Sequence, residues 1–270
     1  MVTPTKARPP GGREAAHDVS NDMKRGKLML PDTVRKRLET LGEVSRQGKR
    51  VNGLFRLMES QDMYLKAYAN LYANKGATTK GIDGATMDGF SEDRVINLIE
   101  LLRERRYAPK PVRRVYIPKK NGKLRPLGVP SGEDKLVQEV ARMLLERIYE
   151  PTFSHDSHGF RTGRSCHTAL EHIRHNWNGV KWLIDVDIKG FYDNINHTKL
   201  IALLEKKIDD KRFIGLIKAM LKAGYMEDWT FHKTHSGAPQ GGIVSPILAN
   251  AYLHELDILD CCDLPFLTLV

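Results

Sequence analysis

Apolar residues recur at helical spacing in three segments of the chain, and a period near 3.6 residues predicts amphipathic helices. The first segment covers about 31–75, with apolar positions at Leu54, Leu57, Met58, Leu65, Tyr68 and Leu71. The second follows Ser91, a candidate N-cap, and its apolar stripe is Val95, Leu98, Ile99 and Leu102. The third ends before Pro151, and its inward positions are Leu136, Val140, Met143, Leu144 and Ile148.

The segment 111–130 alternates instead, and Asn121-Gly122 near its middle is a tight-turn signal, so this pattern predicts a β-hairpin. Its prolines disfavour a central strand, and we therefore expect an edge hairpin or a projecting finger. The hairpin contains no acidic residue, and its basic residues are Arg113, Arg114, Lys119, Lys120, Lys123 and Arg125. Such a charge favours a position beside water or an anion.

The second half of the chain alternates between helical and extended patterns. A helix is expected from about 166, an apolar strand at 180–187, two helices within 197–223 and a polar strand pair near 225–235. A glycine-rich loop and a last helix complete the chain. Helices and strands mixed in this way predict an α+β or an α/β protein.

The charge balance indicates a polyanionic partner. The chain of 270 residues has a formal net charge of +10, and residues 1–50 hold twelve Lys or Arg against six Asp or Glu, a net +6. We interpret residues 1–30, rich in Pro and Gly, as a flexible basic arm. A simply solvated surface is the alternative that charge alone leaves open.

Cysteine usage and hydropathy favour a reducing, cytoplasmic setting of the bacterial type. Cys166, Cys261 and Cys262 have neither metal-site spacing nor the even number of a disulfide framework. The N-terminus lacks an apolar signal core, and no apolar stretch approaches the length of a membrane span. We therefore expect no membrane partner.

Asp187 ends the apolar run that begins at Leu183, and Gly190 then breaks the alternation. A buried carboxylate is costly unless it is paired or bound to a metal. At the end of a strand, beside free backbone carbonyls, it can hold a divalent cation through hard oxygen ligands. A helix-capping or salt-bridged Asp is the structural alternative.

The loop at 236–246, SGAPQGGIVSP, has three glycines around Pro239-Gln240 just before a helix. Glycines there allow a planar or phosphate group to approach the backbone closely. The Gln240 amide can hydrogen-bond to a base or a sugar. Loops of this composition are also common as plain connections between a strand and a helix.

Four motifs, in order, resemble those of group II intron reverse transcriptases, which also act as maturases that help their intron RNA to splice. They are RRVYIPKKNGKLRPLGVP, HGFRTGRSCHTAL, DVDIKGFYDNINH and GAPQGGIVSPILANAYLHELD. The resemblance covers about residues 50–257 and implies an α+β right-hand polymerase fold with fingers and a partial palm. On this basis the chain divides into a basic arm at 1–30, an N-terminal extension at 31–90, fingers at 91–180 and a partial palm at 181–270.

The resemblance implies a polymerase centre with two Mg²⁺ ions, where a primer 3′-hydroxyl attacks the α-phosphate of a deoxynucleoside triphosphate. Asp187 would bind both ions with help from the backbone carbonyl of Ile188. The triphosphate would be held by Arg113, Lys119 and Arg125. Tyr192 would lie beneath the incoming sugar, with a core aromatic as the alternative, and Gln240 would contact the nucleotide and template.

Other basic residues would, by the same resemblance, contact RNA. Arg114 and Lys123 would meet RNA or solvent. Arg161 and Arg164 would touch the nucleic-acid backbone, with loop-capping contacts as the alternative. The expected partners are group II intron RNA, an RNA template with a DNA primer, and deoxynucleoside triphosphates. The sequence does not decide whether the chain forms a homodimer.

The chain departs from the family at one point. The family carries two more catalytic aspartates in a Tyr-Ala-Asp-Asp hairpin, and this sequence has no such tetrad. Asp260 and Asp263 are poor substitutes for that pair. We therefore expect a truncated polymerase that is inactive alone. A non-catalytic RNA-binding splicing module is the competing hypothesis.

Overall fold

The computed structural model describes residues 28–72, 74, 76–88, 90–120, 122–182 and 185–263, with the backbone alone at 259–263. The predicted arm at 1–30 therefore lies outside the described residues except for its last three. Asn121, Leu183 and Ile184 also lie outside them, as do the side chains of Asp260, Cys261, Cys262 and Asp263.

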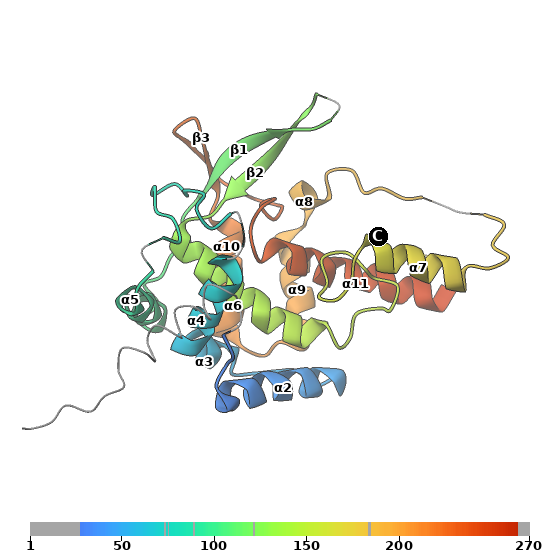
Figure 1. The fold of residues 1–270 in the computed structure, drawn as a ribbon, viewed down its shortest axis with the longest axis horizontal. Helices are drawn as coiled ribbons and strands as arrows, with labels where there is room; N and C mark the ends of the chain where they lie inside the picture. Colours follow the sequence, from blue (N-terminus) through green and yellow to red (C-terminus); the bar gives the residue numbers. More distant parts are fainter. Residues whose placement is uncertain are drawn as a thin grey trace, which may run out of the picture.

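A helical body fills the first half of the chain (Figure 1). Its helices are α2 Asp32–Arg46, α3 Leu54–Met58, α4 Gln61–Tyr72, α5 Glu92–Arg103 and α6 Gly132–Tyr149. Helix α6 lies in the middle, contacts α2, α3 and α4, and is buried around most of its circumference. The helix predicted over 31–75 is in fact divided, since Gly53 takes a left-handed φ of 73° directly before α3.

The predicted apolar stripes face this core. Val95, Leu98, Ile99 and Leu102 of α5 are buried, and so are the five inward positions predicted for α6. The Ser91 side chain accepts a hydrogen bond from the Arg94 N–H and thus caps α5 as predicted. Helix α6 ends at Tyr149, two residues before Pro151.

A four-stranded sheet in the described part of the chain has the order β2-β1-β3-β4. Its strands are β1 Val112–Pro118, β2 Leu124–Val129, β3 Tyr225–Glu227 and β4 Thr230–His232. The predicted hairpin is confirmed: β1 and β2 are antiparallel, β2 is an edge strand, and the hairpin projects from the body (Figure 1). Strand β1 also pairs in parallel with β3 through Val112 and Tyr225.

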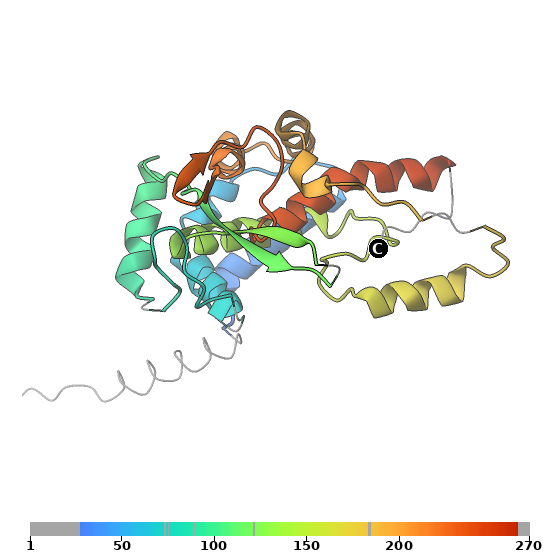
Figure 2. The same ribbon diagram turned by 90° about the horizontal axis from the view of Figure 1, so that it is seen from above.

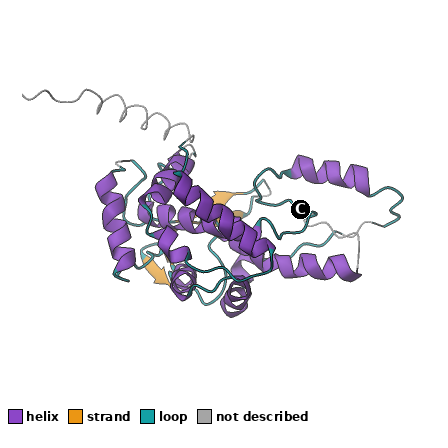
Figure 3. Cartoon of the chain, turned by 90° about the horizontal axis from the view of Figure 1, so that it is seen from below, coloured by secondary structure: helices purple, strands orange, loops and turns teal. Residues whose placement is uncertain are grey.

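The second half adds further helices, namely α7 Cys166–Asn176, α8 Phe191–Asn194, α9 His197–Lys207, α10 Lys211–Lys222 and α11 Ser245–Asp263. The Asn196 side chain accepts a hydrogen bond from the Lys199 N–H and caps the start of α9. Helix α7 and the outer part of α11 extend from the body on the same side (Figure 2). Seen from below, helices dominate and the strands lie mostly behind them (Figure 3).

The strand predicted at 180–187 is wrong for the residues that the structure describes. Residues 180–182 and 185–187 form no strand, and Trp182 and Val186 are exposed. A strand is stabilised by hydrogen bonds to a neighbouring strand. Within the described ranges no other strand pairs with this segment, so its apolar pattern has no sheet to join. In the described part of the chain, no helix is long and apolar enough to cross a membrane.

Candidate nucleotide-binding site

The glycine-rich loop joins the hairpin to the segment that follows Asp187. The Gly128 N–H of β2 donates a 2.6 Å hydrogen bond to the Gln240 carbonyl, and the Ala238 N–H donates one of 2.8 Å to the Tyr192 carbonyl. Gly241 has a φ of 100°, and a Cβ there would lie 2.8 Å from the Gly128 carbonyl oxygen. The glycines thus allow close approach, as expected, but between two parts of the chain's own backbone.

A cavity of about 440 Å³ lies between this loop, the base of the hairpin and the end of α10. Among the residues predicted at the site, it brings together Arg114, Tyr192 and Gln240. Lys110 and Lys233 also line it, and sequence reasoning missed both because neither belongs to a recognisable motif. The cavity combines cations, an aromatic ring and backbone amides, the groups that hold a nucleotide.

Tyr192 serves two purposes at once. It lines the cavity and also packs edge-on against Phe191, with ring centroids 5.7 Å apart. Burial raises the pKa of its hydroxyl, so the ring stays neutral at physiological pH. The core and the cavity-lining interpretations of this residue are therefore compatible.

The basic residues of the hairpin fall into different environments. Lys119 and Arg125 are exposed near the turn, and neither side chain has a hydrogen bond or ion pair among the described residues. Arg113 instead donates from Nε and Nη2 to the Lys80 carbonyl, at 3.0 and 2.8 Å. It therefore anchors the loop before α5, which Lys135 also holds through the carbonyls of Gly76 and Thr79.

Arg114 is engaged within the sheet. Its guanidinium carbon lies 3.6 Å from the centroid of the Tyr225 ring, and Nη1 lies 3.9 Å from a carboxylate oxygen of Glu227. The Tyr116 hydroxyl donates to the same carboxylate. Arg114 thus links β1 to β3 at the wall of the cavity. Lys123, on the same hairpin, is exposed.

Asp187 and Ile188 lie on an exposed connection before α8. No described residue donates a hydrogen bond to the Asp187 carboxylate or forms an ion pair with it. The Ile188 side chain is 44% exposed, and its backbone carbonyl belongs to no strand. A free carboxylate next to a free carbonyl can serve as a pair of hard oxygen ligands for a divalent cation.

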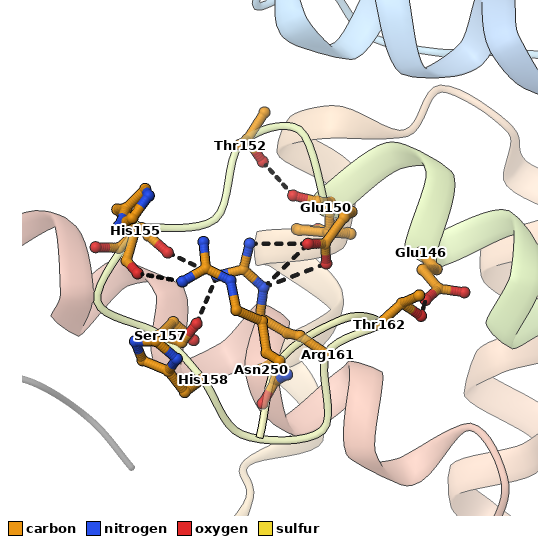
Figure 4. A network of polar contacts seen from close by, with 12 residues as sticks. Glu146, Glu150, Thr152, His155, Ser157, His158, Arg161, Thr162 and Asn250 are labelled. Carbon is orange, nitrogen blue, oxygen red and sulfur yellow. Dashed lines mark hydrogen bonds and ion pairs between the residues drawn. The ribbon is translucent and has the colours of Figure 1, made fainter. Parts of the chain in front are cut away.

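Arg161 holds the loop between α6 and α7 (Figure 4). Its Nη2 donates to Glu150 at 2.9 Å, while Nη1 donates to the carbonyls of Ser154 and Ser157, each at 2.6 Å. Arg161 is 8% exposed. Arg164 similarly donates to the His155 carbonyl at 2.8 Å. In this structure both residues make the loop-capping contacts that were the alternative to RNA binding.

The basic hairpin and the glycine-rich loop line one cavity, and the comparison with known families shows which class of protein carries them. Residues 117–259, more than half of the chain, match the family described as "Reverse transcriptase (RNA-dependent DNA polymerase)". The chain belongs to the reverse transcriptase family. Its α+β class is as predicted, and within this family it is the fingers-and-palm fold.

The relatives specify the group within the family. The chain is 56% identical over 205 residues to the group II intron-encoded protein LtrA of Lactococcus lactis subsp. cremoris, covering 76% of this chain and 34% of LtrA. It is 50% identical over 198 residues to an uncharacterized 91 kDa protein in the cob intron of Schizosaccharomyces pombe, covering 73% of this chain and 24% of that protein. The predicted resemblance to group II intron reverse transcriptases is confirmed. The chain spans about a third of LtrA's length.

Proposed function

We propose that this chain supplies the nucleotide-binding fingers and the first metal-binding aspartate of an RNA-directed DNA polymerase that also acts as a maturase on group II intron RNA. The observation that carries the proposal is the cavity shared by Tyr192, the Gln240 loop and the base of the basic hairpin. A deoxynucleoside triphosphate is the ligand whose base, sugar and phosphates this combination of groups suits.

The triphosphate is assigned to the outer hairpin. The side chains of Lys119 and Arg125 have no partner among the described residues, so their charges are available for phosphate oxygens. Arg113 is a weaker candidate than the sequence suggested, because two of its donors are occupied by the Lys80 carbonyl. Gln240 lies at the inner end, where an amide can contact the base or sugar.

Asp187 is assigned as a Mg²⁺ ligand together with the Ile188 carbonyl. Mg²⁺ needs near-octahedral oxygen coordination and is commonly held by one or two carboxylates plus substrate phosphates and water. An exposed, unpaired carboxylate fits that role. When bound, the ions would favour deprotonation of the primer 3′-hydroxyl and neutralise the leaving pyrophosphate.

The maturase part of the proposal rests on charge and on the intron-encoded relatives. A net charge of +10 favours an RNA partner, and a structured intron RNA presents a dense array of phosphates. The RNA template and DNA primer would follow the same basic surface. The competing function, an RNA-binding splicing module without nucleotide chemistry, uses this surface but leaves the cavity without a role.

A chimera tests the proposal. In LtrA, the region that this chain matches is replaced by the corresponding residues of this chain, and primer extension on an RNA template is measured with and without Asp187→Ala. We expect extension by the parent chimera, its loss in the variant, and unchanged affinity for intron RNA in both. Extension that survives Asp187→Ala would remove the metal assignment. If the parent chimera binds RNA and splices but never extends a primer, the non-catalytic function is correct.

A further inference from the structure

A cluster of metal-ligating side chains lies away from the nucleotide cavity, where the loop after α6 meets α7. His155 and Asp156 belong to the loop, and His172 belongs to α7. One ligand atom of each residue lies within 4.8 Å of the others. The Nε2 atom of His172 is 2.8 Å from a carboxylate oxygen of Asp156. Asp156 and His172 are half-buried, and His155 is exposed.

A fourth group, His158, stands beside this cluster with its ring centroid 5.7 Å from that of His172. His158 is 3% exposed, and its Nδ1 lies 2.9 Å from the Thr168 hydroxyl. That hydroxyl donates its one proton to the Ser165 carbonyl, so toward His158 it can only accept. Nδ1 must therefore carry the hydrogen, which leaves Nε2 as a bare lone pair.

The Nε2 atom of His158 is buried and has no hydrogen-bond partner in the described part of the chain. A buried acceptor without a donor costs free energy, and such groups in native proteins call for an explanation. The unpartnered atom shows that polar groups beside the cluster still lack a partner, although His158 is not among the three residues whose ligand atoms lie within 4.8 Å of one another.

The loop that carries these ligands is held in place independently of any ion. The Arg161 guanidinium fixes the carbonyls of Ser154 and Ser157, and Arg164 fixes that of His155 (Figure 4). Glu150 pairs with Arg161 at 2.9 Å and offsets its charge. The loop ligands therefore lie on a backbone that is already fixed, as is required of a preorganised metal site.

We propose that His155, Asp156 and His172 bind a divalent transition-metal ion of the Zn²⁺ type, which clamps the loop to α7. Imidazole and carboxylate ligands suit such ions, whereas Mg²⁺ prefers oxygen alone. Tetrahedral Zn²⁺ with bonds near 2.0–2.1 Å places its ligand atoms about 3.3 Å apart. The Asp156–His172 pair already lies within that separation, and the exposed His155 side chain is free to close the remainder.

The test is metal binding by the untagged 270-residue chain. Co²⁺ is titrated first, because tetrahedral nitrogen and oxygen coordination gives it an intense visible absorption, and Zn²⁺ is then used to displace it. We expect one equivalent per chain, displacement by Zn²⁺ and no displacement by Mg²⁺. Asp156→Asn and His172→Ala should each weaken binding by about 10-fold or more.

His175→Ala is the matched control, since His175 is an exposed histidine on the same helix and lies outside the cluster. Because a variant can also lose binding through lost stability, thermal unfolding is measured as well. Zn²⁺ should raise the Tm of the parent chain and of His175→Ala, but not that of His172→Ala. Binding that is equal in His172→Ala and His175→Ala, or a Tm that Zn²⁺ leaves unchanged in the parent chain, would overturn the proposal.

Discussion

The main-chain N–H of Gly128 donates to the carbonyl of Gln240 at 2.6 Å, and this bond ties the edge strand of the hairpin to the glycine-rich loop. The two segments are far apart in sequence, yet together they enclose the cavity that we assign to a nucleotide. The geometry of the site therefore depends on backbone contacts at glycines as much as on the charged side chains.

Gly241→Ala should destabilise the protein more than the replacement of a glycine that also has a positive φ but has open space around it. A Cβ at 241 would meet the Gly128 carbonyl oxygen at 2.8 Å, in addition to the cost of a φ of 100°. Gly48→Ala is the control, because Gly48 has a φ of 72° with nothing within 4 Å. We expect about 1–2 kcal/mol for the control from backbone strain alone and clearly more for Gly241→Ala, measured by denaturant unfolding. Equal losses would show that the loop can retreat from β2 at little cost.

Arg161→Ala should lower the free energy of unfolding and should leave the number of RNA phosphates contacted unchanged. The variant leaves the Ser154 and Ser157 carbonyls and the Glu150 carboxylate without their donor, at a cost of roughly 2–4 kcal/mol, since Glu150 is partly exposed. Arg103→Ala removes an exposed side chain that lies 3.9 Å from the Glu59 carboxylate, and it should cost less than about 1 kcal/mol. A stable Arg161→Ala protein with weaker RNA binding would restore the original RNA-contact prediction.

RNA affinity should fall as the salt concentration rises, and single variants should show which residues contribute to this dependence. The logarithm of affinity is expected to fall by roughly 0.7–0.9 per neutralised phosphate for each unit of log salt. Lys123→Ala should reduce this slope by about 1, because Lys123 is a predicted RNA contact of the hairpin. Gln240→Ala should leave it unchanged, because an uncharged amide releases no counterion.

The contribution of the basic arm to RNA binding can be tested by a deletion that leaves helix α2 intact. Helix α2 begins at Asp32 and packs on α6, so removal of residues 1–50 would damage the core. Deleting residues 1–27 removes six Lys or Arg and three Asp or Glu, and should lower the salt slope without changing the Tm. An unchanged slope would show that the arm does not contact RNA and is only a solvated tail.

Stability should fall on acidification partly because of His254. Burial and the nearby charges of Lys207 and Arg161 hold the pKa of this residue below its ordinary value of 6.5, while Glu255 opposes them. Below pH 6.5 the unfolded chain therefore binds more protons at this site than the folded chain, and the stability present above that pH is lost as pH falls toward the folded pKa. The fall in Tm between pH 7 and pH 5 should be smaller in His254→Gln than in the parent. The exposed His167→Gln variant should keep the full fall.

Local patterns predicted much of the fold, because helix stripes, caps and hairpin turns are encoded within a few residues. The Ser91 cap and the alternation in β1 were both recognisable in this way. The segment ending at Asp187 was not, since an apolar run cannot show whether a neighbouring strand exists to pair with it.

The site was predicted unevenly for a similar reason. Tyr192 and Gln240 belong to motifs and do line one cavity. Arg113 and Arg161 also belong to motifs, but their donors are taken by carbonyls that only the folded chain brings near. His155 and His172 form their cluster across a loop and a helix, without the short spacing by which metal motifs are recognised in sequence.

The parallel pairing of Val112 with Tyr225 limits where this protein can be divided into separate parts. The predicted boundary between fingers and palm falls at residue 181, between the two strands that make this pair. A chain cut there would leave β1 with its hairpin partner but without the neighbour on its other side, and β3 and β4 without the rest of their sheet. We therefore expect that the two parts have to be exchanged and engineered as one unit, because each would lose part of a shared sheet.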